Sequence, residues 1–191
     1  MILENDEEID LDAMVMCTGY KYKFPFLSEE IISTEGEHVT PLYKHVLHLN
    51  YHSLMVISVL RNVALYPTSF NQAKFARSVI DGIADLPTKP EMEQDISNEI
   101  QFRRDNNLVG PLWHYMDSLQ WQYDRDLAKV GKFEPISDIL HAYWNFVESH
   151  REKDFCNYWK YDYVMTEDNT LEAFKREEYL EEVNIPNRMV L

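Results

Sequence analysis

Two unbroken runs of apolar residues stand out in the first third of the chain. The first, residues 13–17, follows Asp12 and stops at Thr18-Gly19, and the second covers residues 54–59. Short apolar runs bounded by turn residues are typical of strands buried on both faces. A glycine after such a strand permits a tight turn and close backbone approach, and ligands bind at this edge of open α/β sheets. The first run therefore predicts either an ordinary core strand with a turn or the edge of a ligand site.

The residues before the first run predict a hairpin. Residues 1–3 are apolar, Asn5-Asp6 form a turn signal, and Ile9 and Leu11 alternate with acidic residues. A fold seldom begins inside a strand, so we expect the rest of this sheet upstream of the sequence.

Aromatic residues follow the first run, at Tyr20, Tyr22, Phe24 and Phe26, around Pro25. Proline interrupts a strand, so the segment predicts a loop packed by its rings. Core filling is favoured over ligand stacking, because large aromatic side chains dominate core burial.

A helical period replaces the strand pattern after residue 67. Thr68 or Ser69 is the expected cap of a first helix, and Gly82 lies where that helix would end. Strand, loop and helix start together can hold an electron-rich group with free backbone N–H donors, although any βα unit shows this arrangement. Beyond the linker at 87–90, further helices are predicted from 92 to 100, from 112 to 130 between Pro111 and Gly131, from 136 to 147 after Pro135, and from 171 to 183, with an extended strip at 155–165.

These elements predict an α/β fold of two parts. Residues 1–88 are expected to form part of a Rossmann-like sheet, and residues 89–191 a mostly helical region. The second part contains few strand signals, so the boundary is placed at the proline-rich linker.

Composition narrows the possible partners and location. The 18 basic and 33 acidic residues give a net charge of −15, which disfavours nucleic acid and anionic lipid surfaces. No apolar run reaches about 18 residues and no signal peptide is evident, so we expect a cytoplasmic protein without a transmembrane segment. Cys17 and Cys156 are interpreted as small core residues in a reducing compartment.

Several kinds of site are disfavoured. The histidines at 38, 45, 48 and 52 have no accompanying cysteine or carboxylate at ligand spacing, so a metal site is not expected. The chain has five glycines and no Gly-x-Gly-x-x-Gly or Walker-type loop for a pyrophosphate. No nucleophile lies in an elbow context, which disfavours hydrolases.

Residues 12–26 resemble the Ala-Thr-Gly-Tyr segment of the flavin-containing monooxygenases, where a strand Asp-Ala-Val-Ile-x-Ala-Thr-Gly-Tyr precedes a Phe-Pro-Phe-Leu element. Further segments agree in order: Leu42 to Val46, Ser53-Leu54, Pro67 to Ala76, and Gln120 to Tyr123 with Leu127. Two departures are Cys17, where the family usually has alanine, and Ser58, where it has a glycine that lets the backbone approach the flavin. Both nucleotide fingerprints of the family lie upstream of this motif, so the resemblance covers its carboxyl-terminal part only.

The resemblance implies an FAD- and NADPH-dependent enzyme, of the N,N-dimethylaniline monooxygenase type, that oxygenates a small-molecule nitrogen or sulfur substrate through a flavin hydroperoxide. It implies that Thr18, Gly19 and Tyr20 lie where the two nucleotide-binding domains connect. It places Asn62, Pro67, Gln72 and their neighbours in a strand-loop-helix unit that closes over the flavin ring. No catalytic acid or base is expected, since the flavin carries the chemistry.

As a fragment, the chain is expected to be inactive alone, to bind FAD and NADP weakly, and to require the missing amino-terminal nucleotide-binding part as its partner. Its place in the cell would be the cytoplasm, or the periphery of the endoplasmic reticulum membrane. The alternative is a non-catalytic acidic interaction module whose open sheet edge pairs with another protein.

Overall fold

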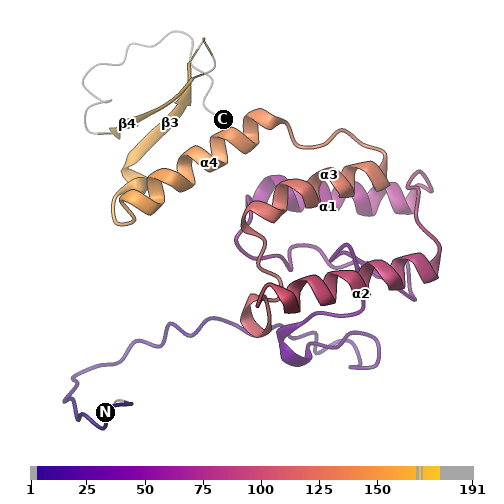
Figure 1. Ribbon diagram of the computed structural model, residues 1–191, viewed down its shortest axis with the longest axis horizontal. Helices are drawn as coiled ribbons and strands as arrows, with labels where there is room; N and C mark the ends of the chain where they lie inside the picture. The colour runs from indigo at the N-terminus through magenta and orange to yellow at the C-terminus, as the bar shows by residue number, and fades with distance from the viewer. Residues whose placement is uncertain (1–3, 167, 169, 177–191) are drawn as a thin grey trace.

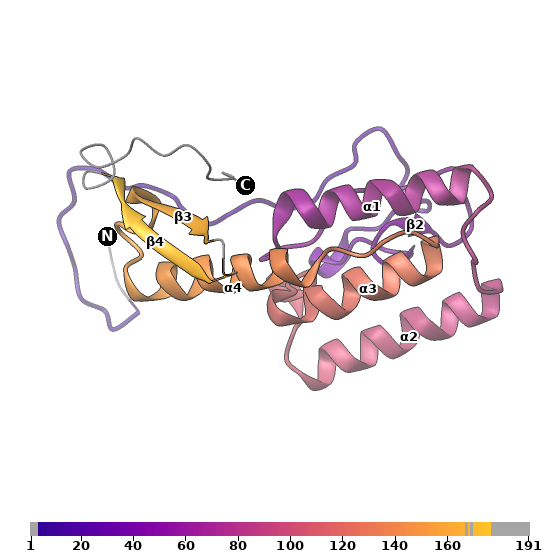
Figure 2. The ribbon, with the colours of Figure 1, turned by 90° about the horizontal axis from the view of Figure 1, so that it is seen from above.

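Three helices form the body of the protein, and a smaller group lies at one end of it (Figure 1). The computed structural model describes residues 4–166, 168 and 170–176. Its main elements are β1 (Leu42–Tyr43), β2 (Leu47–His48), α1 (Leu65–Ile80), α2 (Lys89–Asp105), α3 (Gln120–Gly131), α4 (Asp138–Lys153), β3 (Tyr161–Met165) and β4 (Leu171–Lys175), with short 3-10 helices at Glu35–Glu37, Gly110–Leu112, Asp117–Leu119 and Tyr158–Lys160. Seen from above, α3 lies between α1 and α2, and α4 leads away toward β3 and β4 (Figure 2).

The sheets are small and antiparallel. β1 pairs with β2, with Leu42 opposite His48, and β3 pairs with β4, with Tyr161 opposite Lys175. Within the described part of the chain the parallel pairing is a single bridge between Arg61 and Tyr115. The protein is thus a mixture of helices and small sheets, and a Rossmann-like parallel sheet is not formed among these residues.

The prediction of a buried strand at residues 13–17 is wrong for this structure. The segment pairs with no strand in the part of the chain that the structure describes, and the Val15 side chain is 83% exposed. A strand requires a neighbour for its N–H and C=O groups, and no other described segment lies beside residues 13–17. As Figure 1 shows, the amino-terminal segment extends away from the helical body. Cys17 is therefore exposed, as is Cys156, which corrects their interpretation as core residues.

Residues 54–59 form no regular strand and make only isolated strand contacts. Met55 forms a bridge with Leu47, and the Val56 N–H donates to the Val46 carbonyl at 2.9 Å. Val59 is buried against Ile32 and Val39. This second run therefore lies along the edge of the core instead of inside a sheet.

The aromatic loop is divided between core and surface. Tyr22 and Phe24 pack against the cluster around Ile32 and Val59, as the core-filling interpretation predicts. Tyr20 and Phe26 are exposed. The opening hairpin is described only from residue 4, where a turn at residues 4–6 is present; its first strand lies outside the described residues.

The main core lies between α1, α2, α3 and the β1–β2 turn. It contains Tyr43, Val46, Leu47, Leu60, Phe75, Met92, Met116, Tyr123 and Leu127. Gly131 at the end of α3 is required by packing, because a Cβ there would lie 2.4 Å from the Phe133 ring. The predicted ends of α1 at Gly82 and of α3 at Gly131 agree with the helix bounds within two residues.

Two helix starts differ from the sequence prediction. α1 begins at Leu65, so Thr68 and Ser69 lie inside it, and Pro67 occupies its first turn, where a missing N–H costs little. The helix predicted from residue 112 begins only at Gln120. The N–H groups of Met116 and Asp117 donate to the Arg61 and Asn62 carbonyls, which removes them from a helical pattern.

Local signals account for α2 and α4. Thr88 and Glu91 form a capping box at the start of α2, and Ser137 caps α4. The extended strip predicted at 155–165 is confirmed only for β3. The acidic helix predicted from residue 171 is wrong over β4, whose residues pair with β3; residues 177–183 lie outside the described residues.

Candidate functional site

Two buried glutamines hold the loop that joins residues 54–59 to α1. The Gln72 Oε1 accepts from the Ser58 N–H at 2.8 Å, and the Gln120 Oε1 accepts from the Ala64 N–H at 2.7 Å. Both side chains are fully buried. The loop is thus fixed at both ends by amides that come from α1 and α3.

Gln72 is in turn tied to the centre of the protein. Its Nε2 donates to the Tyr123 Oη at 2.8 Å, and this hydroxyl donates to the Lys44 carbonyl at 2.9 Å. Burial raises the pKa of Tyr123, which keeps the hydroxyl protonated. A hydrogen-bonded chain therefore connects Ser58, α1, α3 and the β1–β2 turn.

Ser58 occupies a backbone conformation that favours glycine. Its φ is +68°, and left-handed conformations cost roughly 1–2 kcal/mol for residues that have a Cβ. Its Oγ lies 2.7 Å from the Ser69 Oγ, on the exposed side of the loop. A serine is therefore accommodated at this position, with its hydroxyl fastened to the first turns of α1.

Asn62, Pro67 and Gln72 lie along this loop and the first half of α1, each in different surroundings. Asn62 has a φ of +52°, and its Nδ2 donates to the Tyr115 Oη at 2.8 Å. Pro67 lies half-buried in the first turn of α1. Gln72 is fully enclosed, so it supports the loop and does not reach a ligand outside it.

Thr18, Gly19 and Tyr20 lie on the extended amino-terminal segment, where all three are exposed. Gly19 has the positive φ that the predicted turn would need, +76°, but residues 18–20 form no turn in this structure. The Tyr20 carbonyl accepts a hydrogen bond from the Arg61 Nη2 at 3.0 Å. Arg61 directly precedes Asn62 in the sequence. The structure thus brings the two predicted groups of site residues near each other through a residue that sequence reasoning missed.

Exposed apolar side chains surround the start of α1. The Tyr66 side chain is 85% exposed and Phe70 is 64% exposed, and Ile57 and Leu65 are also exposed. Tyr66, Phe70, Ala73 and Ile80 recur at helical spacing along one face of α1. Arg77 lies on the same face and is 83% exposed, so the apolar patch is confined to the first turns of α1. Such an exposed apolar patch is typical of a surface that another segment or a ligand covers.

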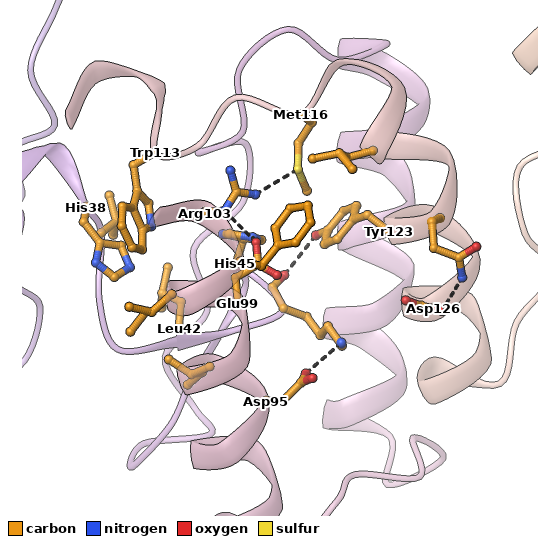
Figure 3. A pocket seen from close by; sticks show the side chains of 17 residues that line it. His38, Leu42, His45, Asp95, Glu99, Arg103, Trp113, Met116, Tyr123 and Asp126 are labelled. Atoms are coloured by element: carbon orange, nitrogen blue, oxygen red, sulfur yellow. Dashed lines mark hydrogen bonds and ion pairs between the residues drawn. The ribbon is translucent and has the colours of Figure 1, made fainter. Parts of the chain in front are cut away.

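A cavity of about 170 Å³ lies on another side of α3, bordered by α2 and residues 38–45 (Figure 3). Its centre contains the Glu99 carboxylate, which lies 2.6 Å from the Arg103 Nε and 3.3 Å from the His45 Nε2. At its edge the Lys44 Nζ lies 2.7 Å from Asp95. The charged groups that line the cavity are thus mostly paired with one another, and they join α2 to the β1–β2 turn.

Burial and neighbouring charges together set the protonation of Glu99 and of the histidines near it. Desolvation alone would raise the pKa of Glu99, but the hydrogen bond and charge of His45, together with Arg103, lower it to about 2. Burial lowers the pKa of His38 to about 4 and that of His114 to about 2, so both imidazoles are neutral at pH 7. Within the described ranges, no three His, Cys, Asp or Glu side chains are grouped so that they could hold a metal ion.

A second buried polar group lies between α1 and α3. The Thr68 Oγ1 donates to the Asp124 Oδ2 at 3.2 Å. Burial raises the pKa of Asp124 to about 6, while Thr68 and the buried Asn71 side chain, as neighbouring hydrogen-bond donors, lower it in part. The position of Asp124 and Gln120 on the core face of α3 is a signal that the sequence does contain, because polar residues at core positions need buried partners.

The arrangement fits part of a flavin. The loop at 57–64 and the exposed face of α1 offer an apolar surface and a fixed backbone suited to a flat aromatic ring system, since ligand sites combine apolar walls with a few polar groups. The pyrophosphate does not fit, because the chain has no glycine-rich turn to hold it. None of the described helices combines the length and the apolar character that crossing a membrane requires.

The model of the flavin-binding monooxygenase-like family matches residues 1–133, and the chain belongs to this family. Its relatives include the trimethylamine monooxygenase of Pelagibacter ubique, which is 28% identical over 78% of this chain, and the flavin-containing monooxygenase FMO GS-OX-like 2 of Arabidopsis thaliana, which is 32% identical over 71%. The solved structure of the S-allyl-L-cysteine S-oxygenase from Allium sativum has a TM-score of 0.74 and 26% identity over 82% of this chain.

The matches cover 33%, 30% and 36% of these three proteins, respectively. The chain thus spans about a third of the length of the relatives it matches. The family resemblance expected from Thr18-Gly19-Tyr20 and the following segments is confirmed, and partial coverage agrees with a carboxyl-terminal portion.

Proposed function

We propose that this chain is the flavin-covering, carboxyl-terminal portion of a flavin-containing monooxygenase that uses FAD and NADPH to oxygenate a small-molecule nitrogen or sulfur substrate. The family match and the names of the relatives support this proposal. In it, residues 1–88 complete the nucleotide-binding α/β domains and residues 89–191 form a helical region packed on them.

The observation that carries the proposal is the exposed apolar face of α1 beside a loop fastened by buried amides. Tyr66 and Phe70 project from the body although large aromatic side chains strongly favour burial. Residues 13–17 are likewise apolar and exposed, and they pair with no strand among the described residues. These features are accounted for together if α1 and residues 13–17 pack against a nucleotide-binding domain.

The site residues take different parts in this proposal. Thr18, Gly19 and Tyr20 form the connection between the nucleotide-binding domains, and Asn62 and Pro67 border the flavin ring. Gln72 acts indirectly, because both ends of its amide are engaged with Ser58 and Tyr123. The flavin, when bound, supplies the oxygen chemistry, and this chain contributes shielding from water and a fixed backbone.

The isolated chain is expected to retain neither FAD nor NADP, since it has no glycine-rich pyrophosphate loop. Gel filtration of the purified chain after incubation with FAD tests this directly. We expect a colourless protein peak; a peak that carries flavin absorbance would contradict this part of the proposal.

A chimera tests the function. The upstream portion of the Allium sativum S-oxygenase, joined to this chain, is expected to bind FAD and to consume NADPH with S-allyl-L-cysteine. Tyr66→Asp and Phe70→Asp should abolish flavin retention, because each places a charge in the proposed interface. Ile139→Asp, which alters a half-exposed apolar residue of α4, is the matched control and should retain the flavin.

A chimera that folds without retaining flavin would refute the proposal. If the isolated chain were in addition a stable monomer, the result would favour the alternative of a non-catalytic acidic interaction module.

A further inference from the structure

Arg61 joins three segments that are distant in the sequence. Its Nη2 donates to the Tyr20 carbonyl at 3.0 Å, its Nε donates to the Tyr22 Oη at 3.1 Å, and its Nη1 donates to the Pro111 carbonyl at 3.3 Å. The guanidinium carbon also lies 5.1 Å from the centre of the Tyr22 ring. All three nitrogens of the guanidinium are therefore engaged.

The backbone of Arg61 is fixed as well. Its N–H donates to the His114 carbonyl at 2.8 Å, and its carbonyl accepts from the Met116 N–H at 3.0 Å. Tyr22 completes the arrangement, because its hydroxyl donates to the Val59 carbonyl at 2.6 Å. The side chain thus projects from a rigid base, and a planar guanidinium with fixed donor directions suits this geometry better than an ammonium group does.

The amino-terminal segment depends on this contact. Among the described residues, no other hydrogen bond joins residues 12–20 to the rest of the chain. The apolar side chains of that segment are exposed, so packing contributes little to its position. Arg61 is therefore the hydrogen-bond contact described for residues 12–20, and it holds Tyr20 two residues before Tyr22 packs into the core.

We propose that Arg61 is a positioning residue that holds Tyr20, and with it Thr18 and Gly19, against the loop that contains Asn62. The link between this segment and a cofactor rests on the proposed function, whereas the positioning itself is a property of this chain. Arg61 contacts neither flavin nor substrate in this proposal; it fixes the distance between the two groups of residues that border the flavin.

A spin label on Cys17 tests the positioning without any cofactor. Cys17 is exposed within the segment, and Cys156→Ser removes the other exposed thiol. Arg61→Met should increase label mobility and raise the rate of tryptic cleavage after Lys21 by about tenfold, the effect of losing one charge-assisted hydrogen bond. Arg61→Lys retains the charge and should restore part of the immobilisation. Arg77→Met, on the exposed face of α1, is the matched control and should change neither readout.

Tyr22→Phe provides a second route if Arg61→Met fails to fold, because it removes one acceptor of Arg61 and leaves the charge in place. Circular dichroism reports folding of each variant. Unchanged mobility and unchanged cleavage in the folded variants would overturn the proposal, and so would a mobility increase in Arg77→Met of the same size. If Arg61→Met increases the mobility of the label but the chimera with Arg61→Met still retains flavin, Arg61 positions the segment and this positioning does not affect the cofactor. A chimera of unaltered sequence that retains no flavin refutes the proposed function and leaves the positioning by Arg61 intact.

Discussion

Gln72→Leu is the most informative single change, because Gln72 connects the candidate site to the core. The substitution keeps a side chain of similar size in a fully buried position. It removes the acceptor of the Ser58 N–H and the donor to the Tyr123 hydroxyl, each at 2.8 Å. The helix itself should persist, since leucine favours helix formation.

The magnitude follows from these two bonds. A net contribution of about 1 kcal/mol for each hydrogen bond predicts a loss of about 2 kcal/mol in the free energy of unfolding. The loss is not larger, because the Tyr123 hydroxyl keeps its bond to the Lys44 carbonyl and the Ser58 N–H lies on an exposed loop that water reaches. For a chain of this size the melting temperature should fall by about 4–8 °C.

Urea denaturation followed by far-ultraviolet circular dichroism measures the effect. Gln122→Leu is the matched control: it lies on the exposed side of α3, where its Nε2 binds only Asp126. That change should stay within about 0.5 kcal/mol. A double-mutant cycle with Tyr123→Phe isolates the bond between the two side chains. If Gln72→Leu were as stable as the control variant, the buried amide would not hold the loop, and the account of the site would be refuted.

Two further predictions concern buried and exposed reactive groups. Asp124 is buried, and its pKa is raised from 3.8 to about 6. The native state therefore binds this proton more tightly than the unfolded chain does. The free energy of unfolding should decrease as pH rises from about 4 to about 6. Asp124→Asn should therefore stabilise the protein by up to about 3 kcal/mol at pH 7 and by much less at pH 4, measured by urea titration at each pH; an equal effect at both would contradict the assignment. Cys17 and Cys156 are exposed, so a thiol reagent should modify both in the native protein without denaturant, whereas slow reaction of either one would show that it is covered.

The sequence was sufficient to identify the segments that form the candidate site, but not the contacts that hold them in place. Asn62, Pro67 and Gln72 lie within one segment, and that segment does form a loop and a helix. Arg61 was not identified, because an arginine in a loop carries no local signal for the carbonyl it will bind 41 residues away. The role of Tyr123 in holding the loop was likewise not predicted, because its acceptor, the Lys44 carbonyl, lies 79 residues away. Gln72 and Gln120 did carry a signal, as polar residues at core positions of a helical pattern.

What the sequence determined by itself is the presence of α1, α2, α3 and α4, and the family. α2 and α4 follow from local caps and periodicity, since those interactions join residues three or four positions apart. Strands depended on tertiary structure. Residues 13–17 have a strand pattern but no strand partner among the described residues, and residues 171–175 begin a stretch with a helical pattern yet pair with β3. The physical reason is that a strand satisfies its backbone only through a neighbour, which lies elsewhere in the chain or in another part of the protein.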